Sequence, residues 1–220
     1  MMFIGTMQAD HSSAIRSFIA VNLSPEVILN LEKILHALEQ ALQVRLKILS
    51  KYGIVRWVPA QKIHLTLKFL GDVPADKISA IQQALQSCLE GCPSFDLLAG
   101  GLDAFPRIKQ PNVIWIGVET PEPLKSIVQR IEDRMEEHGF EKEGRPFKAH
   151  LTLGRVAKNI DPNWIRVLSD VLSEYQENTP GLKNLGSSRI DAVHLYRSDL
   201  RPDGAVYNRL FSVSLINKER

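Results

Sequence analysis

Cysteine is scarce in this sequence. The 220 residues contain two, Cys88 and Cys92, which lie in a stretch with helical periodicity. Their spacing suits neither a zinc ribbon nor a C-x-x-C redox motif. We therefore interpret both thiols as reduced side chains that pack in the core.

Long apolar runs are also missing. No run reaches the roughly 18 residues that a membrane-spanning helix needs, and the first residues lack the basic start and apolar stretch of a secretory signal. The expected location is therefore the cytoplasm, with no membrane partner. Residues 1–14 are expected to form a flexible tail.

Neither sign of charge dominates the composition. The 27 Lys and Arg residues nearly balance the 25 Asp and Glu residues, and the isoelectric point is about 8.5. This balance is compatible with an anionic ligand, but it falls well short of the excess expected for a protein that coats nucleic acid. Any preference for phosphate must therefore come from a local site. A hydrophobic content of 44% over this length supports a buried core and excludes disorder.

The tetrapeptide HLTL is present twice, at His64–Leu67 and at His150–Leu153. The whole sequence contains only six histidines, so two copies with identical leucines indicate duplication or a shared function. The surrounding pattern repeats as well, because each copy follows a predicted strand and helix and precedes another helix. We predict one domain over residues 15–220 with an internal repeat, roughly 16–110 and 111–216, that forms two similar α+β lobes facing each other.

Apolar periodicity and turn signals place the elements of this repeat. Ser24 is expected to cap the first helix and Asp161 the last, each followed by a proline in the first turn. The first half also has about ten additional residues near 41–53. The predicted strands are 16–23, the two HLTL segments, 94–102, 112–118, 188–198 and 205–216, and the predicted helices begin after Ser24, cover 74–90 and 121–139, and begin after Asp161.

The repeated motif suits acid–base chemistry on a phosphate. In a strand, side chains alternate between faces, so the leucines of HLTL point into a core while the histidine and threonine share the other face. Two imidazoles can divide the roles of general base and general acid near neutral pH. The hydroxyls of Thr66 and Thr152 can hold the non-bridging oxygens during in-line hydrolysis of a phosphodiester. This chemistry requires no metal and no other cofactor.

Two cations close to the motifs are candidate phosphate ligands. Lys68 lies four residues after His64, so it is expected to share the face of that histidine. Arg155 lies five residues after His150 and is expected to face away in a regular strand. A bulge at Gly154 would turn Arg155 toward the cleft.

Other interpretations of the histidines remain open. A single histidine on a strand is usually a packed or surface residue, but the repetition favours a functional pair. A metal site is the sharper alternative, although neither motif has H-E-x-x-H spacing or a nearby acidic cluster. We expect His194 to be structural, with a position in the cleft as the alternative, and we assign no role to the remaining histidines, which are His11, His36 and His138.

Several cationic and aromatic residues near the additional segment are candidates for RNA contacts. A solvated basic face or a set of contacts to backbone phosphates would both explain the cations. Base stacking is conceivable for the aromatic residues, but packing is the more common use of such positions. The cations are Arg45, Lys47, Lys51 and Arg56, and the aromatic residues are Trp57 and Phe69.

From about Arg16 to Leu215, the chain resembles the RNA 2′,3′-cyclic phosphodiesterase family, formerly described as 2′-5′ RNA ligases, within the two-histidine phosphoesterase superfamily. The resemblance rests on the opening RSFIAVNLSPEV, the flanked motifs RWVPAQKIHLTLKFLGDV and RPFKAHLTLGRV, and the closing SDLRPDGAVYNRLFSVSL. It implies an α+β fold with two pseudo-twofold-related lobes, each with an antiparallel sheet and packed helices, around a central cleft.

The resemblance also implies an activity. The expected reaction opens a 2′,3′-cyclic phosphate at an RNA end and leaves a 2′-phosphate, and reversible 2′-5′ ligation is a further activity of the family. His64 is then the proton donor and His150 the proton acceptor, although the opposite order remains open. The expected substrates are RNA ends or small cyclic nucleotides, and the expected state is a monomer. A non-catalytic nucleotide- or RNA-binding member of the superfamily is the alternative.

Overall fold

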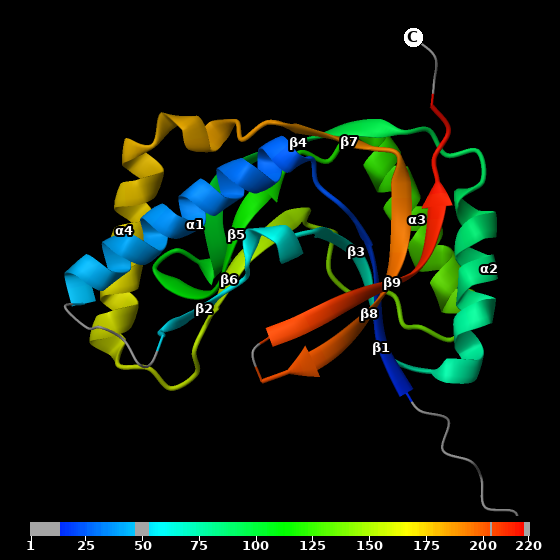
Figure 1. Cartoon of the computed structure of the whole chain (residues 1–220), viewed down its shortest axis with the longest axis horizontal. Coiled ribbons are helices and arrows are strands. Elements are labelled where there is room, and N and C mark those ends of the chain that lie inside the picture. The colour runs from blue at the N-terminus through cyan, green and yellow to red at the C-terminus, as the bar shows by residue number, and fades with distance from the viewer. Residues whose placement is uncertain (1–13, 47–52, 203, 218–220) are drawn as a thin grey trace, which may run out of the picture.

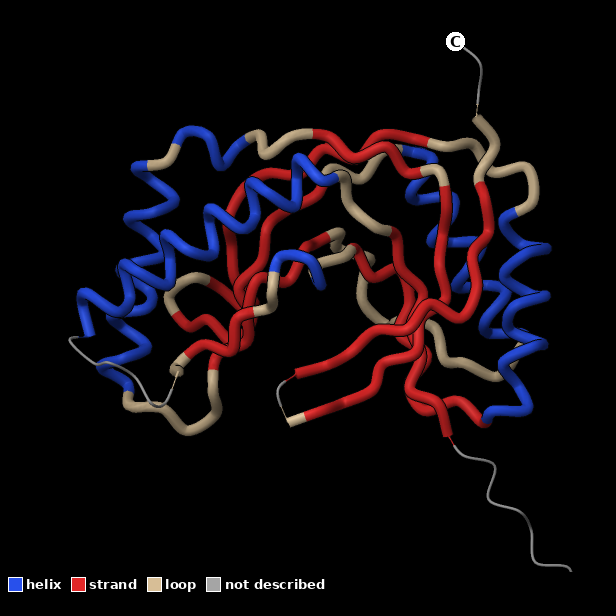
Figure 2. The backbone as a smooth tube through the Cα atoms, viewed as in Figure 1, coloured by secondary structure: helices blue, strands red, loops and turns tan. Residues whose placement is uncertain are grey.

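The computed structural model describes residues 14–46, 53–202 and 204–217. Within these ranges the chain forms a curved sheet whose outer side is covered by helices (Figures 1 and 2). The strands are β1 (Ala14–Val21), β2 (Val55–Trp57), β3 (Leu65–Pro74), β4 (Phe95–Arg107), β5 (Gln110–Val118), β6 (His150–Val156), β7 (Ser187–Ile190), β8 (Ala192–Arg201) and β9 (Gly204–Ser214), and the α-helices are α1 (Pro25–Leu46), α2 (Ile78–Leu89), α3 (Glu122–Glu137) and α4 (Pro162–Asn178).

The sheet has the order β7-β4-β5-β6-β3-β1-β8-β9, and β2 pairs with β6 beside this path. All pairings between these strands are antiparallel. The predicted α+β class with antiparallel strands and packed helices is therefore confirmed. The two strands of the HLTL motifs, β3 and β6, are neighbours at the centre, so the two expected sheets join into one.

The junction between β3 and β6 is short. The two strands pair only at Leu65 and Leu151, whose side chains are 1% and 0% exposed. Farther along, β6 pairs instead with β2, from Gly154 to Val156. The sheet therefore opens beyond the leucine pair, and Arg56 and Trp57 of β2 line one side of the opening.

The helices pack in two pairs. Helix α1 contacts α4 at one end of the molecule and α2 contacts α3 at the other, as Figure 1 shows. Each pair combines one helix from each half of the sequence. Strands are shared in the same way, because β1 of the first half pairs with β8 of the second half. This pairing joins β3 and β1 to β8 and β9. Each side of the fold therefore draws on both halves of the predicted repeat, and the predicted domain division stays a prediction.

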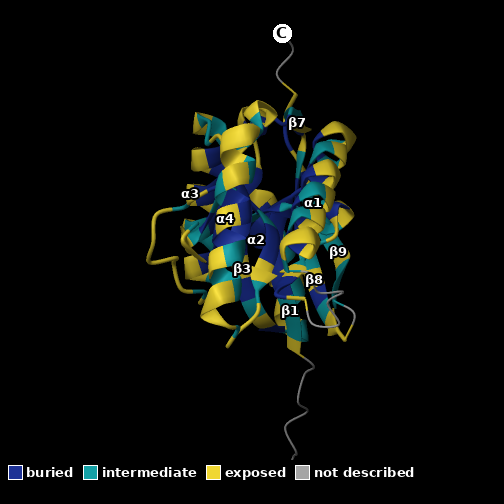
Figure 3. Cartoon of the chain, turned by 90° about the vertical axis from the view of Figure 1, so that its left-hand side faces the viewer, coloured by how far each residue is buried: buried dark blue, intermediate teal, exposed yellow. Residues whose placement is uncertain are grey.

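The expected caps and core residues are present. Ser24 Oγ accepts a hydrogen bond from the backbone N–H of Val27 at 3.3 Å, and Asp161 caps α4 through the N–H of Asn163 at 2.8 Å. Cys88 and Cys92 are free and buried, as predicted. Burial raises the pKa of the Cys88 thiol to about 11, so this thiol stays protonated and packs as an apolar group. Figure 3 shows the buried residues gathered between the helices and the sheet.

Three expectations about the elements change or fall outside the described residues. The predicted strand 188–198 is two strands, because β7 pairs with β4 whereas β8 pairs with β1 and β9. The predicted tail lies outside the described residues up to position 13, and Ala14 already belongs to β1. Helix α1 ends at Leu46, and the rest of the additional segment, 47–52, also lies outside the described residues. Among the described helices, none combines the length and the apolar character needed to span a membrane.

Candidate active site

A pocket of about 420 Å³ lies where the sheet opens between β3 and β6. Its size is in the range of small-ligand sites. Among the described residues, its lining contains four cationic side chains and no carboxylate, and it includes both histidines and both threonines of the HLTL motifs. The cations are Arg16, Arg56, Lys62 and Arg155, and the lining is completed mainly by Phe18, Trp57, Phe69, Ser198, Leu200 and Tyr207.

The two motifs occupy equivalent positions because each strand has the same irregularity. On β3, Ile19 of β1 pairs with Lys68 while Ala20 pairs with Thr66, so Leu67 is an extra residue. On β6 the extra residue is Leu153, between the pairings of Thr152 and Gly154. A bulge of this kind resets the alternation of side chains. As a result, the fifth residue after each histidine, rather than the fourth, returns to the pocket.

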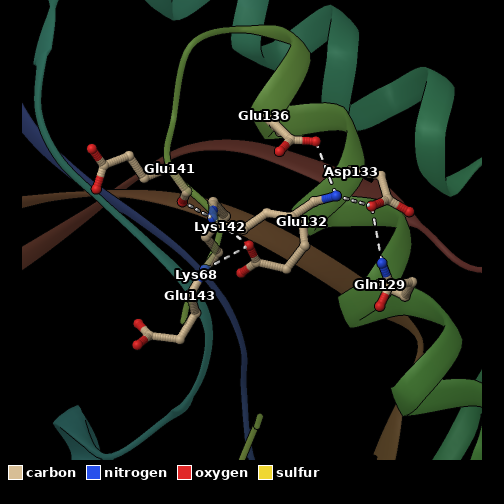
Figure 4. A network of polar contacts seen from close by, with 8 residues as sticks. All are labelled: Lys68, Gln129, Glu132, Asp133, Glu136, Glu141, Lys142 and Glu143. Carbon is tan, nitrogen blue, oxygen red and sulfur yellow. Dashed lines mark hydrogen bonds and ion pairs between the residues drawn. The ribbon is translucent and has the colours of Figure 1, made fainter. Parts of the chain in front are cut away.

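The bulge on β3 removes Lys68 from the site, so the prediction that Lys68 shares the face of His64 is wrong. The Lys68 side chain is 4% exposed, and its ammonium pairs with the Glu132 carboxylate of α3 at 2.6 Å. It also donates to the carbonyl of Glu141 at 2.9 Å. Figure 4 shows Lys68 directed toward the helix and the following loop. Phe69 lines the pocket in its place and is 52% exposed.

The same irregularity on β6 brings Arg155 into the pocket, as the possible bulge at Gly154 suggested. Gly154 also permits the close approach of β2. A Cβ atom there would lie 2.7 Å from Val55 Cγ1 and 2.8 Å from Trp57 Cε3. Because β2 packs so closely, Arg56 lies directly opposite Arg155 in the β2–β6 pairing.

The basic residues near the additional segment, which were candidates for RNA contacts, do not share one position. Arg56 is a pocket residue. Arg45 pairs instead with Glu174 of α4, and positions 47 and 51 lie outside the described residues. Of the two candidates that the structure describes, Arg56 on β2 is the one placed where it can contact a ligand.

Both imidazoles are oriented in the same way. Nδ1 of His64 lies 2.9 Å from the carbonyl oxygen of Lys62, and Nδ1 of His150 lies 2.7 Å from that of Lys148. A carbonyl only accepts hydrogen bonds, so Nδ1 carries a proton in each ring. Nε2 is then the nitrogen that gains or loses a proton. The repeat is therefore longer than HLTL, since each histidine follows a lysine by two residues and uses its carbonyl.

The surroundings of the two rings differ. His64 stacks on Phe18 with centroids 4.8 Å apart and meets the edge of Tyr207 at 5.1 Å. Burial lowers the pKa of His64 below its ordinary value, and the hydrogen bond to the Lys62 carbonyl opposes this shift. His150 meets Phe105 at 5.1 Å in an edge contact. The site is thus symmetric in its reactive groups and asymmetric in its surroundings.

Several lining residues were not predicted from the sequence. Tyr207 and Leu200 come from the β8–β9 hairpin, which reaches the pocket from the far end of the chain. Arg16 of β1 lies over the ring of Phe69, with its guanidinium carbon 4.5 Å from the centroid. The alternation of side chains on β1 could have indicated which face Arg16 occupies. Its contact with Phe69, however, depends on the pairing of β1 with β3. His194 is 7% exposed, bonds to Ser212 Oγ at 2.9 Å and does not line the pocket, in agreement with the structural interpretation.

The fold resembles that of known phosphoesterases. The apo crystal structure of LigT from E. coli matches with a TM-score of 0.60 and 25% identity, over 93% of this chain and 99% of that chain. A protein of Thermus thermophilus shares the fold with a TM-score of 0.64 and 22% identity, over 93% of this chain and 100% of that chain. The fold is that of the LigT-like phosphoesterases.

Sequence comparison gives the family. The profile of the 2′-5′ RNA ligase superfamily matches residues 39–202. A relative from Thermotoga maritima named RNA 2′,3′-cyclic phosphodiesterase is 31% identical over 89% of this chain and 93% of its own length. A relative of the same name from Methanothermobacter thermautotrophicus is 30% identical over 88% and 95%. The chain belongs to the 2′-5′ RNA ligase superfamily, as the sequence motifs indicated.

Proposed function

We propose that this protein hydrolyses 2′,3′-cyclic phosphodiesters at RNA ends to 2′-phosphates, without a metal ion. The observation that carries the proposal is the meeting of His64 and His150, each with its threonine, in one pocket whose described lining has cations and no carboxylate. Such a lining favours an anionic ligand. The names of the relatives agree with this substrate.

The proposed reaction divides acid and base between the two rings. His150 accepts a proton from water through Nε2 as the water oxygen attacks phosphorus. The bond between phosphorus and the 3′ oxygen breaks, and His64 gives its Nε2 proton to that oxygen. The hydroxyls of Thr66 and Thr152 donate to the non-bridging oxygens, where negative charge builds up in the transition state. The products are a 2′-phosphate and a free 3′ hydroxyl.

Joining of 2′-5′ RNA ends is proposed as a second activity of the same site, because a 5′ hydroxyl can take the place of water. Its oxygen attacks the cyclic phosphorus and gives up its proton to the base, the bond to the 3′ oxygen breaks and that oxygen takes the proton of the acid, which leaves a 2′-5′ linkage. The monomeric state, the cytoplasmic location and the single domain over 15–220 with its repeat units stay predictions.

The test uses an oligonucleotide that ends in a 2′,3′-cyclic phosphate, incubated with the protein in excess chelator. We expect turnover, with a 2′-phosphate as the product that separates from a 3′-phosphate standard. Tight binding without product would favour the non-catalytic binder instead. Loss of turnover in chelator, with recovery on adding zinc or manganese, would contradict the metal-independent mechanism.

The assignment of His64 as the acid predicts a specific pH dependence. Because burial lowers its pKa, the ring in the free enzyme loses its proton below the ordinary value near 6.5. The acid form of His64 is therefore lost as the pH rises through this lowered pKa, which limits kcat/KM on the alkaline side. A bound phosphate adds negative charge beside the ring and raises its pKa. The alkaline limb of kcat is thus expected at higher pH than that of kcat/KM.

NMR titration of the His64 ring, with and without a 2′-nucleotide, measures both states directly. We expect a pKa below about 6.5 in the free protein and an upward shift on adding the nucleotide. A ring whose pKa rests at or above the ordinary value in the free protein would contradict the effect of burial. An alkaline limb that does not move between kcat/KM and kcat would assign the acid role elsewhere.

A further inference from the structure

Arg56 and Arg155 form a pair of like charges at one edge of the pocket. They lie directly opposite each other in the β2–β6 pairing, and both are exposed and line the pocket. No ion pair involves either guanidinium within the described ranges. Like charges directly across a strand pair destabilise it. Because neither arginine has a carboxylate partner among the described residues, the arrangement favours an anion that binds between them.

The β8–β9 hairpin lies next to this arginine pair in the pocket. A Cβ atom on Gly204 would lie 3.9 Å from Nη2 of Arg56, so the Arg56 side chain reaches the hairpin. Tyr207 lines the same pocket as both arginines; burial raises the pKa of its phenol, and the positive charges of Arg155 and Arg56 act in the opposite direction. Lys62 donates to the carbonyl of Ala205 at 2.9 Å and holds the hairpin in place. The β8–β9 hairpin therefore borders the arginine pair and contributes the Tyr207 hydroxyl to the same pocket.

The position of the pair along β6 separates it from the reacting phosphate. Arg155 follows Thr152 by three residues, which corresponds to about 10 Å of extended strand, shortened somewhat by the bulge. The groups expected to hold the cyclic phosphate are the two histidines and two threonines. An RNA chain carries its next phosphate one nucleotide upstream of this end. An RNA chain therefore needs a second phosphate-binding position beside the one that holds the cyclic phosphate, and the arginine pair is placed to provide it.

The geometry points to Arg56, acting with Arg155 and the Tyr207 hydroxyl, as the subsite for the internucleotide phosphate immediately upstream of the terminal nucleotide. The inference rests on the proposed function and adds a substrate preference to it. A single-stranded oligonucleotide that ends in a cyclic phosphate is then a better substrate than the cyclic mononucleotide. The rival is that the pair contacts the cleaved phosphate itself, in which case both substrates depend on Arg56 equally.

The experiment compares three substrates: a 2′,3′-cyclic mononucleotide, the dinucleotide with the same cyclic end, and that dinucleotide with a neutral methylphosphonate in place of its internal phosphate. For the wild type we expect kcat/KM to fall about tenfold to a hundredfold from the natural to the neutral dinucleotide, as for loss of a charge-assisted hydrogen bond. In Arg56→Ala the natural and neutral dinucleotides are expected to react at similar rates. Arg56→Lys restores part of the discrimination, because it keeps the charge without the bidentate geometry.

Salt dependence gives a second readout that a merely structural role would not change. Loss of one phosphate contact on a single strand is expected to reduce the slope of log(kcat/KM) against log[salt] by roughly 0.7 for the dinucleotide. Arg134→Ala, on the exposed face of α3, is the matched control and keeps the wild-type discrimination and slope. An equal loss on mononucleotide and dinucleotide in Arg56→Ala, or undiminished discrimination against the neutral dinucleotide, would overturn the subsite. If the wild type fails to hydrolyse even the mononucleotide, the proposed function fails instead.

Discussion

Replacing His64 or His150 with alanine is expected to lower kcat for an RNA end with a cyclic phosphate by about 10²–10⁴-fold, the usual contribution of a positioned general acid or base. Each ring is fixed by its own bond from Nδ1 to a backbone carbonyl. The remaining imidazole therefore keeps its place but lacks its partner in proton transfer. If the two rings act on one transition state, as proposed, the double variant is expected to lose little more than the worse single variant.

The measurement is single-turnover hydrolysis in excess chelator, with folding checked by thermal unfolding of each variant. His36→Ala is the matched control, because His36 is an exposed histidine on α1 outside the pocket. Its rate is expected to equal that of the wild type. If either His64→Ala or His150→Ala retained the wild-type rate while folded, the two-histidine mechanism would be wrong.

Replacing Lys68 with methionine is expected to cost about 3–5 kcal/mol of the free energy of unfolding, the usual penalty for leaving one partner of a buried ion pair without the other. Glu132, whose side chain is 14% exposed, would keep a charge with no ammonium beside it. The Glu141 carbonyl would also lose its donor. For a chain of this length the loss corresponds to a decrease of roughly 6–20 °C in Tm.

Chemical and thermal unfolding measure this effect. Arg134→Ala breaks an exposed pair with Glu137 on the same helix and is expected to cost less than about 1 kcal/mol. The double variant Lys68→Met/Glu132→Leu is expected to recover most of the stability, since it removes the second charge as well. A Lys68→Met protein of normal stability but strongly raised KM would mean that this lysine binds phosphate after all.

The sequence was sufficient to predict the two motif strands and the residues that they bring together. His64 and His150 could be identified because a repeated tetrapeptide needs no knowledge of tertiary structure. The leucines of HLTL then set which face is buried, and the threonines follow from the alternation of a strand. The helices were predicted for a similar reason, because their apolar periodicity and caps are local signals.

Alternation also explains the error at Lys68. Counting faces from His64 assumes that every residue of β3 has a partner, but Leu67 has none. Such a bulge depends on how β1 and β3 pair, which residues close together in sequence do not reveal. At Gly154 the glycine itself suggested a possible irregularity, so a position of Arg155 toward the cleft was considered although a regular strand predicted the opposite; no such signal stands before Lys68.

The exchange of helices and strands between the halves was beyond local reasoning too. Periodicity indicates that α1 and α4 each have an apolar face, but it does not indicate that these faces meet each other. The contribution of Tyr207 required the pairing of β8 with both β1 and β9. Long-range contacts of this kind set which cations and aromatic rings border the pocket, so the inferred substrate preference depends on the structure.

The contact between Leu65 and Leu151 has a mechanical consequence. Each leucine follows one of the two motif histidines in the chain, and this pair is where their strands meet. The separation of the two imidazoles therefore depends on how β3 and β6 meet at these two buried leucines. A change in side-chain volume at either leucine is therefore expected to alter the separation of the two imidazoles without altering any polar group of the pocket.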